Sequence, residues 1–152
     1  MRNAILLVVI VSLLFLAGFA GASDVGTAGM QNGTTVNIQS GGQSYPAYIT
    51  TPGDGGPYPA VVLIHSFNGL EPGYQVMADR LATEGFVVIA PEWQTFAQTP
   101  EDAVMEGLIR DTVAYLETRP EVNSSSIGLT GFCAGGRYTM LFLPQIEEFS
   151  AG

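Results

Sequence analysis

Residues 127–136 read IGLTGFCAGG, and they decide the fold of this chain. The run Ile127–Thr130 is short and mostly apolar, as expected of a strand inside a sheet. Cys133 then stands between Gly131 and Gly135, and a helical stretch follows. A strand, the pattern Gly-x-nucleophile-x-Gly and a helix together predict a nucleophile elbow, a turn so tight that side chains at the glycine positions would collide. The alternative is an ordinary Gly-rich turn with an inert, buried cysteine.

An elbow makes Cys133 the nucleophile of the protein. Its place at the start of a helix favours the thiolate, the reactive form, because the helix dipole is positive there. The backbone N–H of Ala134, next in the chain, points in such a turn toward an oxyanion formed on an attacked carbonyl. Cys133 is also the only cysteine, so no disulfide forms within the chain.

The residues upstream of the elbow predict alternating strands and helices. Ala60–Ile64 is continuously apolar, as in a strand covered on both faces. A helix over 73–84 and a strand over 86–90 follow it. Before it, Thr34–Gln39 and Ser44–Thr50 predict a hairpin. This order predicts an α/β fold with a mostly parallel sheet, an N-terminal antiparallel hairpin and helices on both faces.

A longer helix is expected just before the strand of the elbow. Thr99 supplies a hydroxyl cap, Pro100 falls in the first turn, and the acids that follow lie near the positive end of the dipole. Pro120 ends this helix. One apolar stripe along it comprises Met105, Ile109, Val113 and Leu116.

Residues 1–22 predict export. Arg2 gives a positive start, residues 4–20 are almost unbroken apolar sequence, and Ala20-Gly21-Ala22 fits a signal-peptidase site. The alternative is an uncleaved anchor that attaches the protein to the membrane through residues 4–20. In either case the domain is expected outside the cytoplasm, secreted or membrane-anchored.

The composition allows one globular domain and argues against a nucleic-acid partner. Apolar residues make up 47% of the 152 residues, enough for a core. The net charge is −9, with fourteen acids, five arginines and no lysine. A protein that binds a nucleic-acid backbone needs clustered cations, which this chain does not have.

Several short segments resemble the dienelactone hydrolase family of the α/β-hydrolase superfamily. The similarity covers roughly residues 45–145, and its elbow carries cysteine where most relatives of the wider fold carry serine. The resemblance implies an α/β-hydrolase fold, with residues 45–152 as a partial hydrolase domain. Residues 23–44 are predicted from their own composition and pattern to be a flexible lead and the first strand. The matching segments are Val62-Leu63-Ile64-His65, Asn68-Gly69-Leu70, Ala78-Asp79-Arg80-Leu81-Ala82, Glu84-Gly85-Phe86-Val87-Val88, Ala90-Pro91 and Gly131-Phe132-Cys133-Ala134-Gly135-Gly136.

The family implies hydrolysis of lactones or activated esters by a cysteine thiolate, with no metal and no organic cofactor. The resemblance makes the N–H of Phe67 the second oxyanion donor, with one residue either way left open. His65 is the only histidine, and it falls where this fold often has a histidine that forms structural hydrogen bonds beside the oxyanion loop. Ser66 departs from the family, because many members carry an acid there. Thiol activation or substrate preference is therefore expected to differ.

The catalytic acid and histidine that this fold places after its nucleophile are not found after Cys133. We therefore expect the C-terminal strands of the fold to be missing and this chain alone to be almost inactive. We also expect Ile127–Thr130 to be a bare sheet edge. An alternative follows from that edge: a non-catalytic binding or assembly protein that pairs through it. A second alternative is a thiol sensor built on Cys133.

Overall fold

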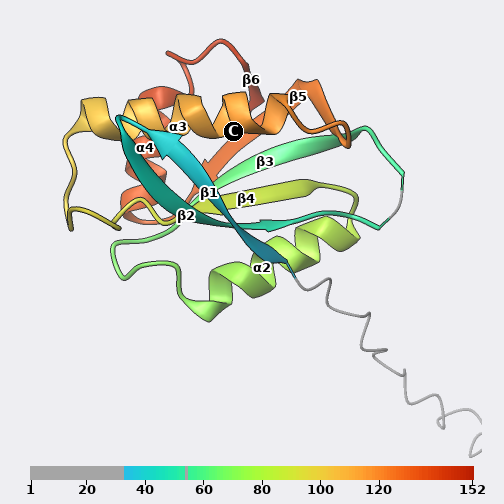
Figure 1. Ribbon diagram of the computed structural model, residues 1–152, viewed down its shortest axis with the longest axis horizontal. Helices are drawn as coiled ribbons and strands as arrows, with labels where there is room; N and C mark the ends of the chain where they lie inside the picture. The colour runs from blue at the N-terminus through green and yellow to red at the C-terminus, as the bar shows by residue number, and fades with distance from the viewer. Residues whose placement is uncertain (1–32, 54) are drawn as a thin grey trace, which may run out of the picture.

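A computed structural model describes residues 33–53 and 55–152 of the chain (Figure 1). The predicted signal peptide or anchor, 1–22, and nearly all of the predicted flexible lead lie outside these residues. Within the described ranges, no helix is long and apolar enough to cross a membrane. The elements in chain order are β1 (Thr34–Ser40), β2 (Gln43–Thr50), β3 (Tyr58–Ile64), α2 (Pro72–Thr83), β4 (Val87–Pro91), α3 (Asp102–Glu117), β5 (Val122–Gly131), α4 (Ala134–Phe142) and β6 (Phe149–Ala151).

The strands form one six-stranded sheet in the order β1-β2-β4-β3-β5-β6. The hairpin β1–β2 is antiparallel, and β2 joins β4 in antiparallel fashion. The strands β4, β3, β5 and β6 run parallel to one another. The predicted fold class, an α/β fold with a mostly parallel sheet and an N-terminal hairpin, is therefore confirmed. Figure 1 shows α2 against one face of the sheet and α3 against the other.

The two faces of β3 explain why the sheet is covered twice. Val62 and Ile64 point into the larger core with the apolar stripe of α3, whereas Leu63 points into a smaller core with Ala78 of α2. All three strand residues are fully buried. A strand with both faces buried has to be continuously apolar, as the sequence of β3 indicated. The predicted stripe of α3 is confirmed, because all four of its residues are buried.

The start of α3 differs from the prediction. The helix begins at Asp102, its N-cap is Glu101, and no side chain caps it. The predicted Thr99 cap with Pro100 in the first turn is therefore wrong. Glu101 has extended dihedral angles, and its carbonyl accepts the first helical hydrogen bonds from Val104 and Met105.

The strand of the elbow is longer than predicted and is not bare. β5 begins at Val122, because Tyr58 of β3 pairs with Val122 and extends the strand through polar, exposed residues. The parallel strand β6 pairs with Ile127 and Gly128, and the Ser150 hydroxyl donates to the Ile127 carbonyl over 3.2 Å. The predicted bare edge at Ile127–Thr130 is therefore wrong, since β6 lies along part of it.

A partly buried hydrogen bond ties α2 to the hairpin. The Tyr48 hydroxyl of β2 donates to the Asp79 carboxylate of α2 over 2.7 Å and accepts from the N–H of Gly33 over 2.8 Å. The Asp79 side chain is buried. Burial and the neighbouring carboxylate raise the pKa of Tyr48, so its hydroxyl stays protonated and keeps donating.

Candidate active site

Cys133 has the backbone of a nucleophile elbow. Its φ is 56° and its ψ is −113°, and it is the only non-glycine residue with positive φ in the described part of the chain. An L-residue at this φ is strained, and such strain persists only where the surrounding structure enforces it. Cys133 is the N-cap of α4 and is exposed to solvent. The alternative of an inert, buried cysteine does not fit this exposure.

The two glycines of the motif are required by close backbone contacts. A Cβ on Gly131 would lie 2.5 Å from the carbonyl carbon of Gly135. A Cβ on Gly135 would lie 2.7 Å from the carbonyl carbon of Ile64 and 2.9 Å from the carbonyl oxygen of His65. Carbon atoms normally approach no closer than about 3.5 Å. The elbow therefore exists only because both positions are glycine.

The sheet register brings the loop after β3 beside the elbow. Ile64, the last residue of β3, pairs with Gly131, the last residue of β5, and the Phe132 N–H donates to the Ile64 carbonyl over 3.3 Å. Because β3 and β5 are parallel, the loops that follow them begin at the same end of the sheet. Phe67 and Ala134 consequently line one cavity of about 350 Å³, which we call the Phe67–Ala134 cavity.

In the loop after β3, all but one of the backbone N–H groups from Ser66 to Gly69 have an acceptor. The Ser66 N–H donates to the Tyr74 hydroxyl (3.0 Å), that of Asn68 to the Ser66 hydroxyl (3.3 Å), and that of Gly69 to the Ser66 carbonyl (3.2 Å). Within residues 33–53 and 55–152, the Phe67 N–H has none. Ala134 is the first residue of α4, where an N–H has no acceptor inside the helix.

Two glutamines hold the carbonyl of Phe67 from the loop after β4. The side-chain amides of Gln94 and Gln98 donate to it over 3.0 Å and 3.3 Å. The Gln94 amide also donates to the Gln98 carbonyl over 3.0 Å. Sequence reasoning missed both residues, because nothing in the polar stretch that contains them indicates a contact with a loop so distant in the chain.

His65 is buried beneath this loop. Its Nδ1 lies 2.8 Å from the Ser66 carbonyl, which can only accept, so Nδ1 carries the proton. The ring stacks on Trp93 at 5.1 Å, and the Trp93 indole N–H donates to the His65 carbonyl over 3.2 Å. Burial lowers the pKa of His65, and its buried Nε2 has no partner among the described residues. These contacts agree with the predicted structural role.

An ion pair lies on the rim of the Phe67–Ala134 cavity. Arg137 of α4 donates to both carboxylate oxygens of Asp102, each over 2.8 Å, and its guanidinium lies 5.2 Å from the ring centre of Tyr138. The hydrogen bond from Arg137 lowers the pKa of Asp102, and the same bond raises the pKa of Arg137. Nothing in the sequence pattern indicated this pair.

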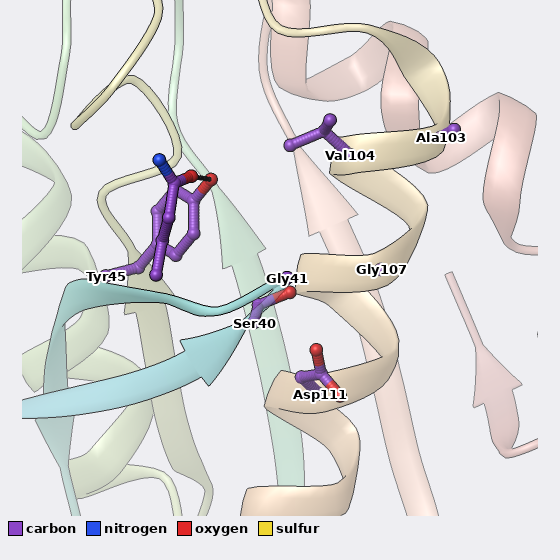
Figure 2. Close-up of a pocket in the computed structure, with 8 residues that line it drawn as sticks. Ser40, Gly41, Tyr45, Ala103, Val104, Gly107 and Asp111 are labelled. Carbon is purple, nitrogen blue, oxygen red and sulfur yellow. Dashed lines mark hydrogen bonds between the residues drawn. The ribbon is translucent and has the colours of Figure 1, made fainter.

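A separate hollow of about 300 Å³ lies between the hairpin turn and α3 (Figure 2). Figure 2 shows Tyr45 on the strand side and Val104 and Asp111 on the helix side. The Tyr45 hydroxyl donates to the Gln43 side chain over 3.0 Å. Neither a cysteine nor a histidine is among the residues that line this hollow, so it holds neither a thiol nor an imidazole base. The described residues contain no group of three or more side chains suited to hold a metal ion.

A mostly parallel sheet with an antiparallel hairpin, covered by helices and carrying a strained cysteine on a strand–helix turn, defines an α/β hydrolase. The model of the dienelactone hydrolase family matches residues 45–152. The chain belongs to the dienelactone hydrolase family, as its sequence segments indicated.

Curated relatives and solved structures agree with this membership. "Protein usf" of Aquifex pyrophilus is 31% identical over 134 residues, which cover 76% of this chain and 57% of the relative. The Escherichia coli (strain K12) protein named "Putative carboxymethylenebutenolidase" is 31% identical over 132 residues, covering 76% and 49%. A crystal structure named "Putative Dienelactone Hydrolase", from Klebsiella pneumoniae, superposes with a TM-score of 0.70 at 25% identity, covering 78% of this chain and 57% of that one. The chain thus spans about half the length of the curated relatives it matches.

Proposed function

We propose that this protein hydrolyses ester or lactone bonds with Cys133 as its nucleophile. The observation that carries the proposal is the backbone of Cys133, which is held at positive φ by two glycines that admit no side chain. Strain of this kind concentrates at functional sites, because only a functional advantage offsets its cost. Membership of a hydrolase family supports the same conclusion.

The proposed first half-reaction transfers an acyl group to the thiol. The Cys133 thiolate attacks the ester carbonyl, a carbon–sulfur bond forms, and the carbonyl electrons move onto oxygen. Collapse of this oxyanion breaks the carbon–oxygen bond to the leaving alcohol, which takes a proton from solvent. Attack by water on the thioester then releases the acid and restores the thiol.

The N–H groups of Phe67 and Ala134 are proposed as the oxyanion donors. Both residues line one cavity beside the nucleophile, and neither N–H is committed elsewhere in the described structure. In a trans peptide the C=O and N–H point in opposite directions. His65 and Gly69 hold the Ser66 carbonyl from one side, so the Phe67 N–H is presented on the other. His65 would then act as a positioning residue.

We propose that residues 1–152 accept an acyl group but release it slowly. Their only histidine is His65, whose Nδ1 is committed to Ser66 and whose Nε2 is buried. Loss of general acid–base transfer commonly costs about 10²–10⁴-fold in rate. Single acylation, rather than turnover, is therefore the expected behaviour. The alternative of an assembly protein that pairs through an exposed sheet edge has less support, because β6 pairs with part of the edge that was expected to be bare.

Mass spectrometry of Cys133 tests this proposal, because the chain has no other thiol. Two rates are measured on Cys133: acylation by p-nitrophenyl acetate, and alkylation by iodoacetamide, a reaction that forms no oxyanion. The ratio of acylation to alkylation is then compared with the same ratio measured on the free thiol 2-mercaptoethanol. One oxyanion donor is worth about 10²–10³-fold, so the ratio should exceed that of the free thiol by at least about 10²-fold. A Cys133 that is alkylated normally but acylated no faster than 2-mercaptoethanol would refute the proposal.

A further inference from the structure

A second cavity begins one residue before the nucleophile. It has a volume of about 440 Å³, and we call it the Phe132 cavity. The ring centres of Phe132 and Tyr74 lie 6.2 Å apart, so the two rings are neighbours in its wall. Its walls come from the start of α2 and from the elbow, and the residues that line it are Glu71, Pro72, Gly73, Tyr74, Met77 and Phe132.

The walls of the Phe132 cavity suit an apolar group. Phe132 is 45% exposed, so a substrate bound there would remove a large ring surface from water. Met77 adds a flexible apolar side chain that adapts to the shape of a ligand. The hydroxyl of Tyr74 already accepts the N–H of Ser66. The cavity volume lies within the range of small-molecule sites, at its lower end.

The charge around the nucleophile disfavours an anionic substrate. Glu71 is the only charged residue that lines the Phe132 cavity, and no ion pair involves it in the described part of the chain. The positive ends of the α2 and α4 dipoles lie at Glu71 and at Cys133, and each amounts to only about half a unit charge. The α2 end therefore offsets about half of the Glu71 charge, and the α4 end acts at the reacting carbonyl of either ester. Arg137, beside the other cavity, is neutralised by Asp102. Arg80 lies in the last turn of α2, at the far end of that helix.

We infer that the site selects uncharged esters whose small apolar acyl group occupies the Phe132 cavity. This inference rests on the proposed acyl transfer to Cys133 and names its substrate class. The acyl chain of such an ester leaves the reacting carbonyl toward Phe132, while the carbonyl oxygen faces Phe67 and Ala134. A carboxylate on the acyl group would meet Glu71, and no unpaired cation of the described residues lines the Phe132 cavity. The preferred substrates would thus differ from a butenolide with a carboxymethylene group, the compound that the name of the Escherichia coli relative contains.

Two activated esters of nearly the same shape test the charge selection. The acyl chain of p-nitrophenyl butyrate ends in a methyl group, and that of mono-p-nitrophenyl succinate ends in a carboxylate at the same position. Their acylation rates on Cys133 are each divided by the rate on 2-mercaptoethanol. We expect the butyrate to be favoured. The Glu71→Gln variant should reduce the preference by about twofold to threefold, the effect of one unit charge at about 8 Å in water. The preference should also shrink at 1 M salt.

Glu84→Gln is the matched control. It removes the same charge from the C-cap of α2, at the end of a 12-residue helix that is about 18 Å long. That distance exceeds the Debye length of about 8 Å at physiological salt, so this variant should leave the preference unchanged. An equal effect of both variants would show a general charge effect and would overturn the role of Glu71.

A third ester tests the apolar contact. p-Nitrophenyl phenylacetate should acylate Cys133 about tenfold faster than p-nitrophenyl acetate after the same normalisation, because part of its ring becomes buried. The Met77→Ser variant should lower this ratio. Since the ratio is measured within one protein, a general loss of stability does not mimic the effect.

The outcomes separate this inference from the proposed function. No acceleration with any ester, together with normal alkylation, would refute acyl transfer and this inference with it. Acceleration that is equal for the butyrate and the succinate, or greater for the succinate, would overturn only the substrate class. Iodoacetamide and iodoacetate repeat the comparison of a neutral with an anionic reagent without an acyl step. If Cys133 prefers iodoacetate more than 2-mercaptoethanol does, the inferred selection of uncharged substrates is also contradicted.

Discussion

Replacing Gly135 by alanine should disrupt the elbow. The new Cβ would lie 2.7 Å from the Ile64 carbonyl carbon and 2.9 Å from the His65 carbonyl oxygen, so backbone must move by roughly 1 Å to restore normal contacts. Neither side yields easily, because β3 is paired with strands on both edges. Overpacking costs about 1–3 kcal/mol, and backbone-to-backbone contacts belong at the upper end. We expect the free energy of unfolding to fall by about 3 kcal/mol.

The same shift should also slow acylation of Cys133. A misplacement of about 1 Å commonly costs about 10²-fold in rate, and here it separates the nucleophile from the loop that carries Phe67. Urea denaturation, followed by the fluorescence of the single buried tryptophan, Trp93, measures the stability. Mass spectrometry of the thioester measures the rate.

Gly136→Ala is the control for Gly135→Ala. The nearest atom to its Cβ is the Gly131 carbonyl oxygen at 3.4 Å, and the residue is helical. Because alanine is a better helix former than glycine, the free energy of unfolding should stay the same or rise by up to about 1 kcal/mol. If Gly135→Ala matches the wild type in both stability and acylation, the close backbone approach is not what requires glycine, and the reasoning is refuted.

Three further predictions concern strain, pH and a partly buried hydrogen bond. Cys133→Gly should raise the free energy of unfolding by about 1 kcal/mol, because glycine adopts the φ of 56° without strain. Cys133→Ala should not raise it, because alanine keeps a Cβ. Equal urea midpoints for these two variants would contradict this prediction. Because burial lowers the pKa of His65 below its ordinary value near 6.5, the unfolded chain takes up the proton more readily. Stability that is present above pH 6.5 should therefore be lost as the pH falls through this value toward the lower folded pKa. Urea titrations between about pH 5 and 7 should show this loss in the wild type and not in His65→Gln, and parallel curves would rule out His65 as the cause. Tyr48→Phe should lower the free energy of unfolding by about 2 kcal/mol, because the buried Asp79 carboxylate loses its donor, and a change below about 0.5 kcal/mol in the urea midpoint analysis would refute that role.

Much of the elbow around Cys133 was predictable from sequence because its geometry is local. The positive φ of Cys133 and the close contact of Gly131 with Gly135 arise within five consecutive residues. The free N–H of Ala134 likewise follows from its place at the start of a helix. Neighbouring residues alone determine such features, so a short motif suffices to predict them.

The electrostatic surroundings of the site were not predictable in the same way. Arg137 and Asp102 stand 35 positions apart, and Gln94 reaches the Phe67 carbonyl across 27 positions. Each contact depends on how α3, α4 and the loop after β4 pack on the sheet. The bare edge expected at Ile127–Thr130 failed for the same reason, since β6 is too short for its residues to indicate a strand.

The sequence by itself determined the order of strands and helices, the buried faces of β3 and α3, and the elbow at Cys133. These properties follow from hydrophobic periodicity and from the conformations that glycine permits, which act over a few residues. Only the tertiary structure decided that the Phe67 N–H lacks an acceptor among the described residues while its neighbours have one. It also decided that His65 is buried under the loop and that Glu71 lines the Phe132 cavity. These features depend on the register between β3 and β5 and on the packing of α2, which no local pattern encodes.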